Sequence, residues 1–277
     1  MSTERLTVST PTASGPPRRP PPVPPAVERI AAGRPVRTVW ANEVGGLTLE
    51  VGAGAGRCFV KWAPTGSGID LTGEVQRARW AGAFAAVPRV LDEGADETGA
   101  WFVSAALPGQ SAVSERWTAE PDRAVEAIGR GLRTLHDTLP VPACPFSWSA
   151  EERLATVRSR AAAGMLGPRD GGPEHQDLTV SEALAILEDV PPLDRLVVCH
   201  GDACSPNTLI DERGLPSGHV DLGSLGVADR WAVLAIATWS TQWNYGRGWE
   251  TRLLEAYGVE PDPHRTAYYR LLWDLCP

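Results

Sequence analysis

The sequence predicts an α+β protein with two lobes, a small β-rich N-terminal lobe and a larger, mainly α-helical C-terminal lobe. Short runs of alternating and β-branched residues, typical of strands, occupy the chain from Val36 to Ser104. After Pro121, apolar residues recur three and four positions apart, which is typical of helices that bury one face. Between the two patterns, Leu107-Pro108-Gly109 interrupts the chain and is the candidate hinge.

The length and composition restrict the classes of protein. The 277 residues are enough for one large domain or two modest lobes with real cores. The net charge of −8 argues against a nucleic-acid partner, because neutralising phosphates requires an excess of Lys and Arg. No apolar run would span a bilayer, the start lacks the layout of a secretory signal, and the five scattered cysteines suit a reducing compartment. We therefore expect a cytoplasmic protein with neither a membrane nor a nucleic-acid partner.

The domain organisation follows from the same patterns. Residues 1–25 are rich in Pro, Ser and Thr and offer no apolar face, which predicts a disordered or polyproline-like tail. The run Pro16–Pro25 could dock onto another domain, but an inert tail is the simpler interpretation. We expect the N-terminal lobe at residues 26–106 and the C-terminal lobe at residues 107–277.

A five-stranded sheet is expected in the N-terminal lobe. Three strands that begin near Val36, Leu47 and Arg57 form a meander, because short turns separate them. Two further strands, Pro88–Leu91 and Trp101–Ser104, complete the sheet on either side of a charged turn.

Two glycine-rich turns join the first three strands. The run Gly52–Gly56 is similar to a dinucleotide-binding fingerprint, but a strand rather than a helix follows it, so we interpret it as a hairpin turn. The turn Asn42–Gly46, which contains Gly45, is the better candidate for covering a phosphate, since backbone amides in a tight turn can approach phosphate oxygens.

Lys61 and Glu74 form a candidate pair on the nucleotide side. Alone, Lys61 would be a strand lysine whose ammonium reaches water, and Glu74 an acid that suits the start of a helix. Together, in a strand and in the helix that follows, they match a lysine that grips phosphates and a glutamate that orients it.

Helices are expected over most of the C-terminal lobe. The clearest is Pro121–Thr138, whose apolar residues form a single stripe. Thr179 and Glu182 have the spacing of a capping box at the start of another helix. Further helices are predicted at residues 149–163, 231–243, 249–257 and 263–275.

The segment Leu196–Arg230 carries the chemistry. It contains an apolar strand, a turn with His200-Gly201-Asp202, and two short strands, Thr208–Asp211 and Ser217–Val220, which should pair as a hairpin. Asn207 precedes the first of these strands and Asp221 follows the second.

Both Asn207 and Asp221 should therefore lie at the open end of the hairpin, close enough to share one Mg²⁺ ion. Asp202 begins the same loop and would face the acceptor of the reaction. Phosphoryl transfer from ATP needs a carboxylate near the acceptor hydroxyl, a divalent metal on the phosphates, and cationic or amide groups around them. The segment supplies the first two.

Two other interpretations were weighed for this segment. Asn and Asp are common in turns because they bond the local backbone, which could explain Asn207 alone but not the whole ordered set. A zinc site from Cys199, His200 and Cys204 is disfavoured, because their spacing fits no standard pattern and no second Cys/His pair lies nearby.

The order of these motifs resembles that of the aminoglycoside phosphotransferases, antibiotic kinases with a protein-kinase-like fold. VVCHGDACSPN is similar to their HGDxxxxN catalytic loop, and GHVDLGSLGVADRW to their metal motif. The resemblance covers residues 36–277 and is greatest to the 3′- and 3″-phosphorylating members. It also includes the segments GEVQRARW, VPRVLDEGAD, WFVSAALPG, CPF and YYRLLWDL.

The resemblance implies roles for the central segment. Asp202 would orient and deprotonate the antibiotic hydroxyl. Asn207 and Asp221 would bind Mg²⁺.

It also implies roles on the nucleotide and drug sides. Lys61 would contact the α- and β-phosphates of ATP and would be held in place by Glu74. The backbone at Ser104 and Ala106 would hydrogen-bond adenine. Asp274 would bind ammonium groups of the drug, because carboxylates steer and hold a polycationic substrate.

The chain departs from the family pattern at several positions. Val233 stands where relatives usually have an aspartate that braces the catalytic loop, and Gly45 where they often have serine. Residues Thr238–Trp249 include no acid, although relatives usually place several there for the drug. Ser224 and Trp273 replace a frequent arginine and an acidic residue. The groups for ATP chemistry are therefore complete, whereas the acceptor pocket is altered.

Three functions remain open. The leading hypothesis is ATP- and Mg²⁺-dependent phosphorylation of an aminoglycoside hydroxyl, which confers antibiotic resistance. A kinase of the same fold that acts on another small alcohol or an antibiotic-biosynthesis intermediate is favoured by the acid-poor segment and its aromatic residues. A weakly active nucleotide-binding scaffold is suggested by Val233 and the proline-rich tail, but it would not need Lys61, Asp202, Asn207 and Asp221 together.

Overall fold

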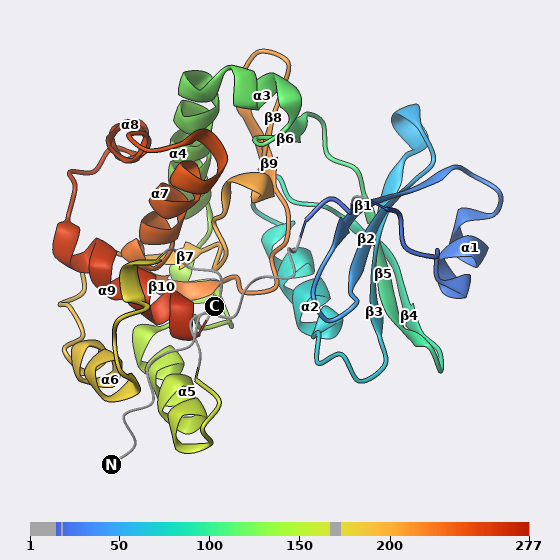
Figure 1. Cartoon of the computed structure of the whole chain (residues 1–277). Coiled ribbons are helices and arrows are strands. Elements are labelled where there is room, and N and C mark those ends of the chain that lie inside the picture. The colour runs from blue at the N-terminus through green and yellow to red at the C-terminus, as the bar shows by residue number, and fades with distance from the viewer. Residues whose placement is uncertain (1–14, 18, 167–172, 277) are drawn as a thin grey trace. The chain divides into compact units, whose positions relative to one another are not determined.

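The computed structural model describes residues 15–17, 19–166 and 173–276 (Figure 1). Its chain divides into two compact units, of which one ends at Leu107 and the next begins at Pro108. We name them the N-terminal unit and the C-terminal unit.

The N-terminal unit is built on a five-stranded antiparallel sheet with the strand order β1-β2-β3-β5-β4. The sheet and its three-stranded meander confirm the predicted arrangement of strands. In chain order its elements are α1 (Pro25–Ala31), β1 (Val36–Ala41), β2 (Leu47–Val51), the 3₁₀ turn η1 (Gly54–Gly56), β3 (Cys58–Pro64), α2 (Leu71–Ala81), β4 (Val90–Ala95) and β5 (Gly99–Ala105).

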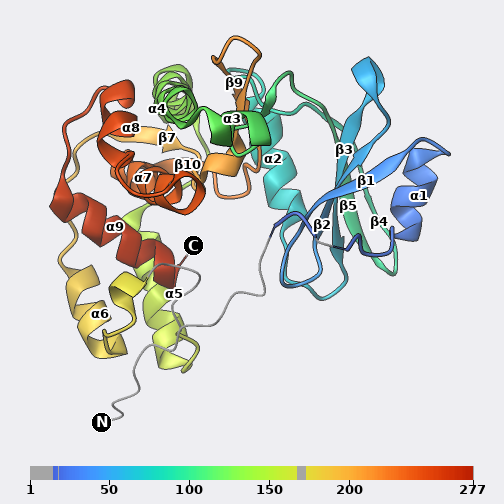
Figure 2. The same ribbon diagram turned by 45° about the horizontal axis from the view of Figure 1, so that its top comes forward.

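One helix covers each face of this sheet (Figure 2). Consecutive strand residues point to opposite faces, and Phe102 and Val103 on β5 show the result. Val103 lies in the core cluster that includes Val27 of α1, whereas Phe102 lies in the cluster that includes Val75 of α2. Lys61 pairs with Phe102 across the sheet and so belongs to the α2 face.

The start of this unit differs from the prediction. Residues 1–14 and 18 of the predicted disordered tail lie outside the described residues. Gly15 exchanges two backbone hydrogen bonds with Ala41, with N···O distances of 3.0 and 2.9 Å, and Val23 packs against the sheet core. Helix α1 then begins at Pro25 rather than after it, because proline is well suited to the first position of a helix. The ordered chain therefore starts before residue 26.

Strand β4 also extends further than predicted. Asp92, Glu93 and Gly94 pair with β5 although the charged residues suggested a turn there. β4 is an edge strand, and its Asp92 and Glu93 side chains are exposed, so the charges are compatible with the sheet. The turn between β4 and β5 consists of Asp96, Glu97 and Thr98.

The C-terminal unit is mainly helical. Its two small antiparallel sheets have the strand orders β10-β7 and β6-β8-β9. Its elements are β6 (Gln110–Ser111), α3 (Glu115–Ala119), α4 (Pro121–Thr138), η2 (Val141–Ala143), α5 (Ala150–Ala162), η3 (Pro173–His175), α6 (Val180–Glu188), β7 (Leu196–Cys199), η4 (Ser205–Asn207), β8 (Thr208–Ile210), β9 (Pro216–His219), β10 (Gly226–Asp229), α7 (Trp231–Tyr245), α8 (Glu250–Tyr257) and α9 (Pro263–Leu275).

Helix α7 lies in the core of this unit and packs against α8 and α9 (Figure 1). Its residues from Trp231 to Thr241 are all buried. Helices α4 and α8 approach closely at Gly129, where a Cβ would lie 2.5 Å from the carbonyl oxygen of Leu253. The buried His136 ring at the end of α4 bonds the Tyr257 hydroxyl through Nδ1, at 2.8 Å.

The predicted long helices of this unit are confirmed, and so is the capping box at the start of α6. The short elements α3, β6 and β10 were not predicted, because two to five residues show no clear periodicity. No helix in the described part of the chain is both long and apolar enough to cross a membrane.

Candidate active site

The N-terminal unit holds the predicted phosphate-binding pair. Lys61 Nζ lies 2.7 Å from Glu74 Oε1, and the two side chains are 21% and 10% exposed. Glu74 is in the first turn of α2, whose N-terminus is capped by Asp70 through the Gly73 amide. Because the pair is mostly buried, salt screens it less than it would a surface ion pair. The structure thus brings together two residues that the sequence places 13 positions apart.

The turn between β1 and β2 is tight. Gly45 has a φ of +84°, a left-handed conformation that favours glycine, and a Cβ there would lie 3.3 Å from Pro64 Cγ. Asn42 closes the turn by accepting the Gly46 amide at 2.6 Å and the Gly45 amide at 3.2 Å. The Gly45 amide is therefore used inside the turn, and Val44 at its tip is exposed. The phosphate-covering role of this turn stays a prediction.

The predicted adenine-binding residues have different surroundings. Ser104 is buried within β5, where it pairs with both Phe59 of β3 and Val90 of β4. Ala106 lies one residue beyond the end of β5. The backbone of Ala106 is consequently more open to a ligand than that of Ser104, which lies between two neighbouring strands.

The C-terminal unit holds the predicted catalytic loop, which follows β7. His200 Nε2 donates to the Val220 carbonyl at 2.8 Å, while Nδ1 accepts the Asp202 amide at 3.3 Å. These two bonds require the neutral Nε2–H tautomer. Gly201 has a φ of +83°, and a Cβ at this position would lie 2.0 Å from the Ser224 carbonyl oxygen. His200 and Gly201 of the motif therefore fix the backbone from which Asp202 projects.

Asp202 and Asn207 are in direct contact. Asn207 Nδ2 donates to the backbone oxygen of Asp202 at 3.0 Å and to its Oδ2 at 3.2 Å. The other carboxylate oxygen, Oδ1, is buried and receives no hydrogen bond from the described residues. A buried carboxylate oxygen without a donor is unfavourable, so Oδ1 is suited to receive the proton of a bound hydroxyl group.

The thiol of Cys204 lies beside this carboxylate. Burial, together with the negative charge of Asp202, raises the pKa of the thiol well above its ordinary value. Cys204 therefore stays protonated and adds no further negative charge to the loop.

The hairpin places Asn207 and Asp221 at the same end, as predicted. Thr208 pairs with His219, and one step further the Val220 amide donates to the Asn207 carbonyl at 3.0 Å. Asp221 follows with a φ of 65°, which few residues other than glycine adopt and which Asp tolerates better than most. Its side chain is exposed.

The donor set at this end suits Mg²⁺. Mg²⁺ prefers oxygen ligands and usually takes one or two carboxylates, with water and phosphate oxygens completing its shell. Asp221 offers a carboxylate, and the hydrogen bonds of Asn207 Nδ2 direct the amide nitrogen toward Asp202, which leaves the amide oxygen as the ligand atom. No group of three His, Cys, Asp or Glu side chains that could hold a metal occurs in the described part of the chain.

A contact that the sequence did not predict braces the catalytic loop. Val233 is buried in the apolar core, so it cannot replace a bracing aspartate. Instead, the Ser205 amide donates to Ser240 Oγ of α7 at 2.8 Å, and Asn244 Nδ2 donates to Ser240 O and Oγ at 2.8 and 3.1 Å. The sequence does contain a signal for this contact, a pair of polar residues four positions apart in an apolar helix, Ser240 and Asn244.

The structure buries Asp274, the residue that the resemblance implied for the drug. Its carboxylate is fully buried on α9, and Oδ2 bonds Nδ1 of His175. The carboxylate is therefore not exposed to an ammonium group of a substrate in this structure. The geometry therefore does not favour Asp274 as a direct ligand for the drug, and sequence reasoning could not have found His175, which is 99 residues distant.

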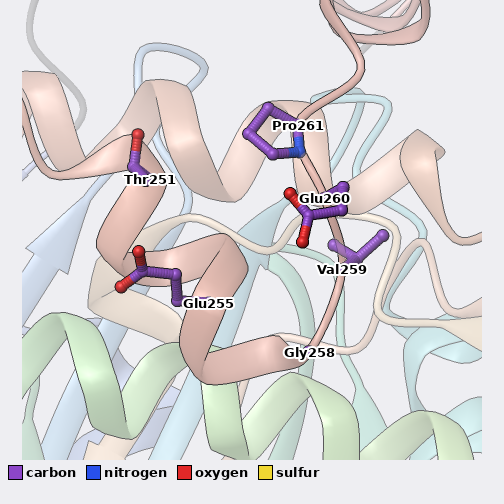
Figure 3. A pocket seen from close by; sticks show the side chains of 6 residues that line it. All are labelled: Thr251, Glu255, Gly258, Val259, Glu260 and Pro261. Atoms are coloured by element: carbon purple, nitrogen blue, oxygen red, sulfur yellow. The ribbon is translucent and has the colours of Figure 1, made fainter.

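A separate hollow of about 480 Å³ lies at the end of α8 (Figure 3). Figure 3 shows Glu255 on α8 and Glu260 on the segment that follows. None of the predicted site residues lines this hollow. It is therefore not the candidate active site.

These features define a class of protein. A five-stranded antiparallel sheet with a Lys–Glu pair, and a helical unit with a His-Gly-Asp loop beside an Asn/Asp hairpin, are the parts of a phosphotransferase with a kinase-like fold. The chain belongs to the phosphotransferase enzyme family, whose model matches residues 28–269. The resemblance found in the motifs is thereby confirmed.

Individual relatives carry more specific names. An aminoglycoside 3'-phosphotransferase of Streptomyces fradiae is 37% identical over 219 residues, which cover 76% of this chain and 81% of that protein. The crystal structure of a type VIII aminoglycoside-3'-phosphotransferase has a TM-score of 0.74 at 31% identity and covers 90% of this chain and 96% of its own. An aminoglycoside phosphotransferase from Streptomyces rimosus, in complex with ADP and streptomycin, has a TM-score of 0.68 at 25% identity and covers 90% and 95%.

Proposed function

We propose that the protein transfers the γ-phosphoryl group of ATP to a hydroxyl group of an aminoglycoside antibiotic and so confers resistance. The observation that carries the proposal is the geometry of Asp202, which Asn207 holds by two bonds while its buried Oδ1 receives none from the described residues. The named relatives support the substrate class, and the relative solved with ADP and streptomycin supports the phosphate donor.

In the proposed reaction, the oxygen of the acceptor hydroxyl bonds to the γ-phosphorus of ATP as the bond to the leaving ADP oxygen breaks. Asp202 Oδ1 receives the hydroxyl proton, and Asn207 fixes the carboxylate through Oδ2. Lys61 binds the phosphates of the nucleotide and is oriented by Glu74. Asn207 and Asp221 would hold Mg²⁺, which supplies charge neutralisation on the phosphates when it is bound.

We place this reaction in the cytoplasm. None of the five cysteines forms a disulfide with another cysteine of the chain, which suits a reducing compartment. ATP as the phosphate donor also requires an intracellular pool. Fractionation of expressing cells, with activity measured in each fraction, tests this placement.

The experiment is a coupled assay of ADP release with purified protein, ATP, Mg²⁺ and a panel of aminoglycosides that includes streptomycin. Drug-dependent ADP release and a phosphorylated product by mass spectrometry are expected, and Asp202→Asn should abolish both. Asp211→Asn is the matched control, because Asp211 is an acid of the same hairpin that bonds only to its own turn and to Arg213. ATP binding without drug-stimulated turnover would contradict the proposal.

A kinase that acts on another small alcohol is the second candidate. It is favoured by α7, which carries no charged residue between Trp231 and Tyr245. Turnover of neutral or singly charged alcohols in the same assay, with no turnover of any aminoglycoside, would establish this alternative.

A further inference from the structure

Three tryptophan side chains gather where α7 and α9 meet. The ring centroids of Trp239 and Trp243 are 5.2 Å apart, those of Trp243 and Trp273 are 5.9 Å apart, and those of Trp239 and Trp273 are 6.4 Å apart. We call Trp239, Trp243 and Trp273 the indole cluster. Its rings are tilted or edge-on to one another, which are the favourable arrangements for aromatic pairs.

The indole cluster lies one helical turn from the residue of α7 that contacts the candidate catalytic loop. Residues three and four positions apart are neighbours on a helix, so Trp243 lies beside both Trp239 and Ser240 on the surface of α7. Ser240 is the residue whose Oγ accepts the Ser205 amide of the catalytic loop. Ser240 therefore connects the helix surface around Trp243 with the loop that contains Asp202.

Core packing explains only part of the cluster. Trp239 is 1% exposed and has the ordinary role of a buried aromatic residue. Trp243 is 42% exposed, whereas each of the other ten tryptophans is buried or half-buried. Trp243 therefore packs on two other rings and keeps enough exposed ring area to contact a ligand.

Three acids of this unit, on η3, α8 and α9, already have partners. Asp274 is buried against His175, Glu174 lies 3.6 Å from Arg270, and Glu250 accepts from Gln242 at 2.5 Å. Arg270 itself lies over the ring of Trp239, 5.3 Å from its centroid. A positively charged group of a ligand would therefore meet an indole face here sooner than an unengaged carboxylate.

From these contacts we propose that the indole cluster binds an amino-sugar ring of the acceptor, with an ammonium group over the exposed face of Trp243. Trp is the best aromatic partner for a cation, because the face of its ring is negative. The inference rests on the proposed function and specifies its acceptor side. Recognition is then by ring contact rather than by the set of carboxylates that the resemblance implied.

The test compares Trp243→Leu, which keeps apolar area but removes the ring, with Trp243→Phe, which keeps a smaller ring. With the aminoglycoside that turns over fastest, Trp243→Leu should raise the KM for the drug more than twofold and up to about 30-fold, the range of one cation–π contact. The kcat and the KM for ATP should change less than about threefold, since the proposed role of the Trp243 ring is to bind the drug and not the nucleotide. Trp243→Phe should recover most of the drug affinity.

Trp80→Leu is the control, because Trp80 is also a partly exposed helical tryptophan that packs on another ring, that of Phe84. It lies in the N-terminal unit and should leave the KM for the drug unchanged. A KM within twofold of the wild type for Trp243→Leu, or equal losses for the Leu and Phe variants, would overturn the inference.

Failure of the proposed function would be recognised separately. If the wild type releases no ADP with any aminoglycoside, the same variants are titrated with streptomycin by calorimetry without ATP. A Kd that Trp243→Leu weakens and Trp243→Phe restores would still support the indole cluster. Absence of binding to the wild type, or a Kd that Trp243→Leu leaves unchanged, would reject it.

Discussion

Replacement of Ser240 by alanine tests whether α7 positions the catalytic loop. The variant removes the Oγ atom that accepts the Ser205 amide at 2.8 Å, and both residues are fully buried. Leaving a buried amide without an acceptor costs about 1–3 kcal/mol. Ser205 lies between Asp202 and Asn207, so loss of this hydrogen bond removes a support from the backbone that joins the two residues.

If this free energy is lost from the transition state, kcat should fall roughly 5- to 150-fold. The KM for ATP should change little, because the N-terminal unit that holds Lys61 and Glu74 is not altered. Steady-state assays of ADP release give both constants, and urea denaturation gives the free energy of unfolding. The expected result is a loss of kcat at temperatures where the variant remains folded.

A matched control separates positioning from stability. Thr241→Val removes a buried hydroxyl of the same helix, one that donates only to the Thr238 carbonyl at 2.7 Å. It should be destabilised to a similar degree but keep its kcat. A wild-type kcat for Ser240→Ala, or equal losses of kcat in both variants, would refute the positioning role of Ser240.

Three further predictions concern the ion pair, the pH dependence and the loop glycine. Lys61→Ala should raise the KM for ATP and lower kcat at least tenfold, whereas Arg57→Ala, which breaks the Arg57–Glu50 pair of the same sheet, should leave both unchanged. Burial lowers the pKa of both His136 and His219 to about 3, so below pH 6.5 the unfolded chain binds protons that the folded chain excludes. The free energy of unfolding should therefore fall by roughly 3 kcal/mol between pH 6.5 and 5, which denaturation at several pH values measures, and an unchanged value would contradict the lowered pKa values of the two histidines. Gly201→Ala should abolish turnover, because its Cβ would overlap the Ser224 carbonyl oxygen; an active, folded variant in the ADP assay would disprove this.

Much of the catalytic geometry could be predicted because it is local. The hairpin is defined by its turn residues and by alternation within twelve residues, and the pairing of Thr208 with His219 follows from that pattern. Asn207 and Asp221 then have to lie at its open end. The capping box of Thr179 and Glu182, and the position of Glu74 in the first turn of α2, are likewise set by residues three or four positions away.

Contacts between distant segments could not be predicted. Ser240 braces Ser205 across 35 residues, and His175 engages Asp274 across 99 residues, so neither partner is visible in a local pattern. The aromatic residues of α7 had two interpretations in the sequence, as core or as a binding surface. The structure buries Trp239 and leaves Trp243 exposed, so only Trp243 is available to a ligand.

The sequence by itself therefore predicted the candidate nucleotide-binding and catalytic residues of this protein. Periodicity, turn chemistry and motif order act over a few residues, and they were sufficient to define the two units, the Lys61–Glu74 pair and the Asp202 loop. Only the tertiary structure decided the acceptor side. Whether Asp274 is open to a ligand, and which indole faces solvent, depends on how α7 and α9 pack against segments far away in the chain.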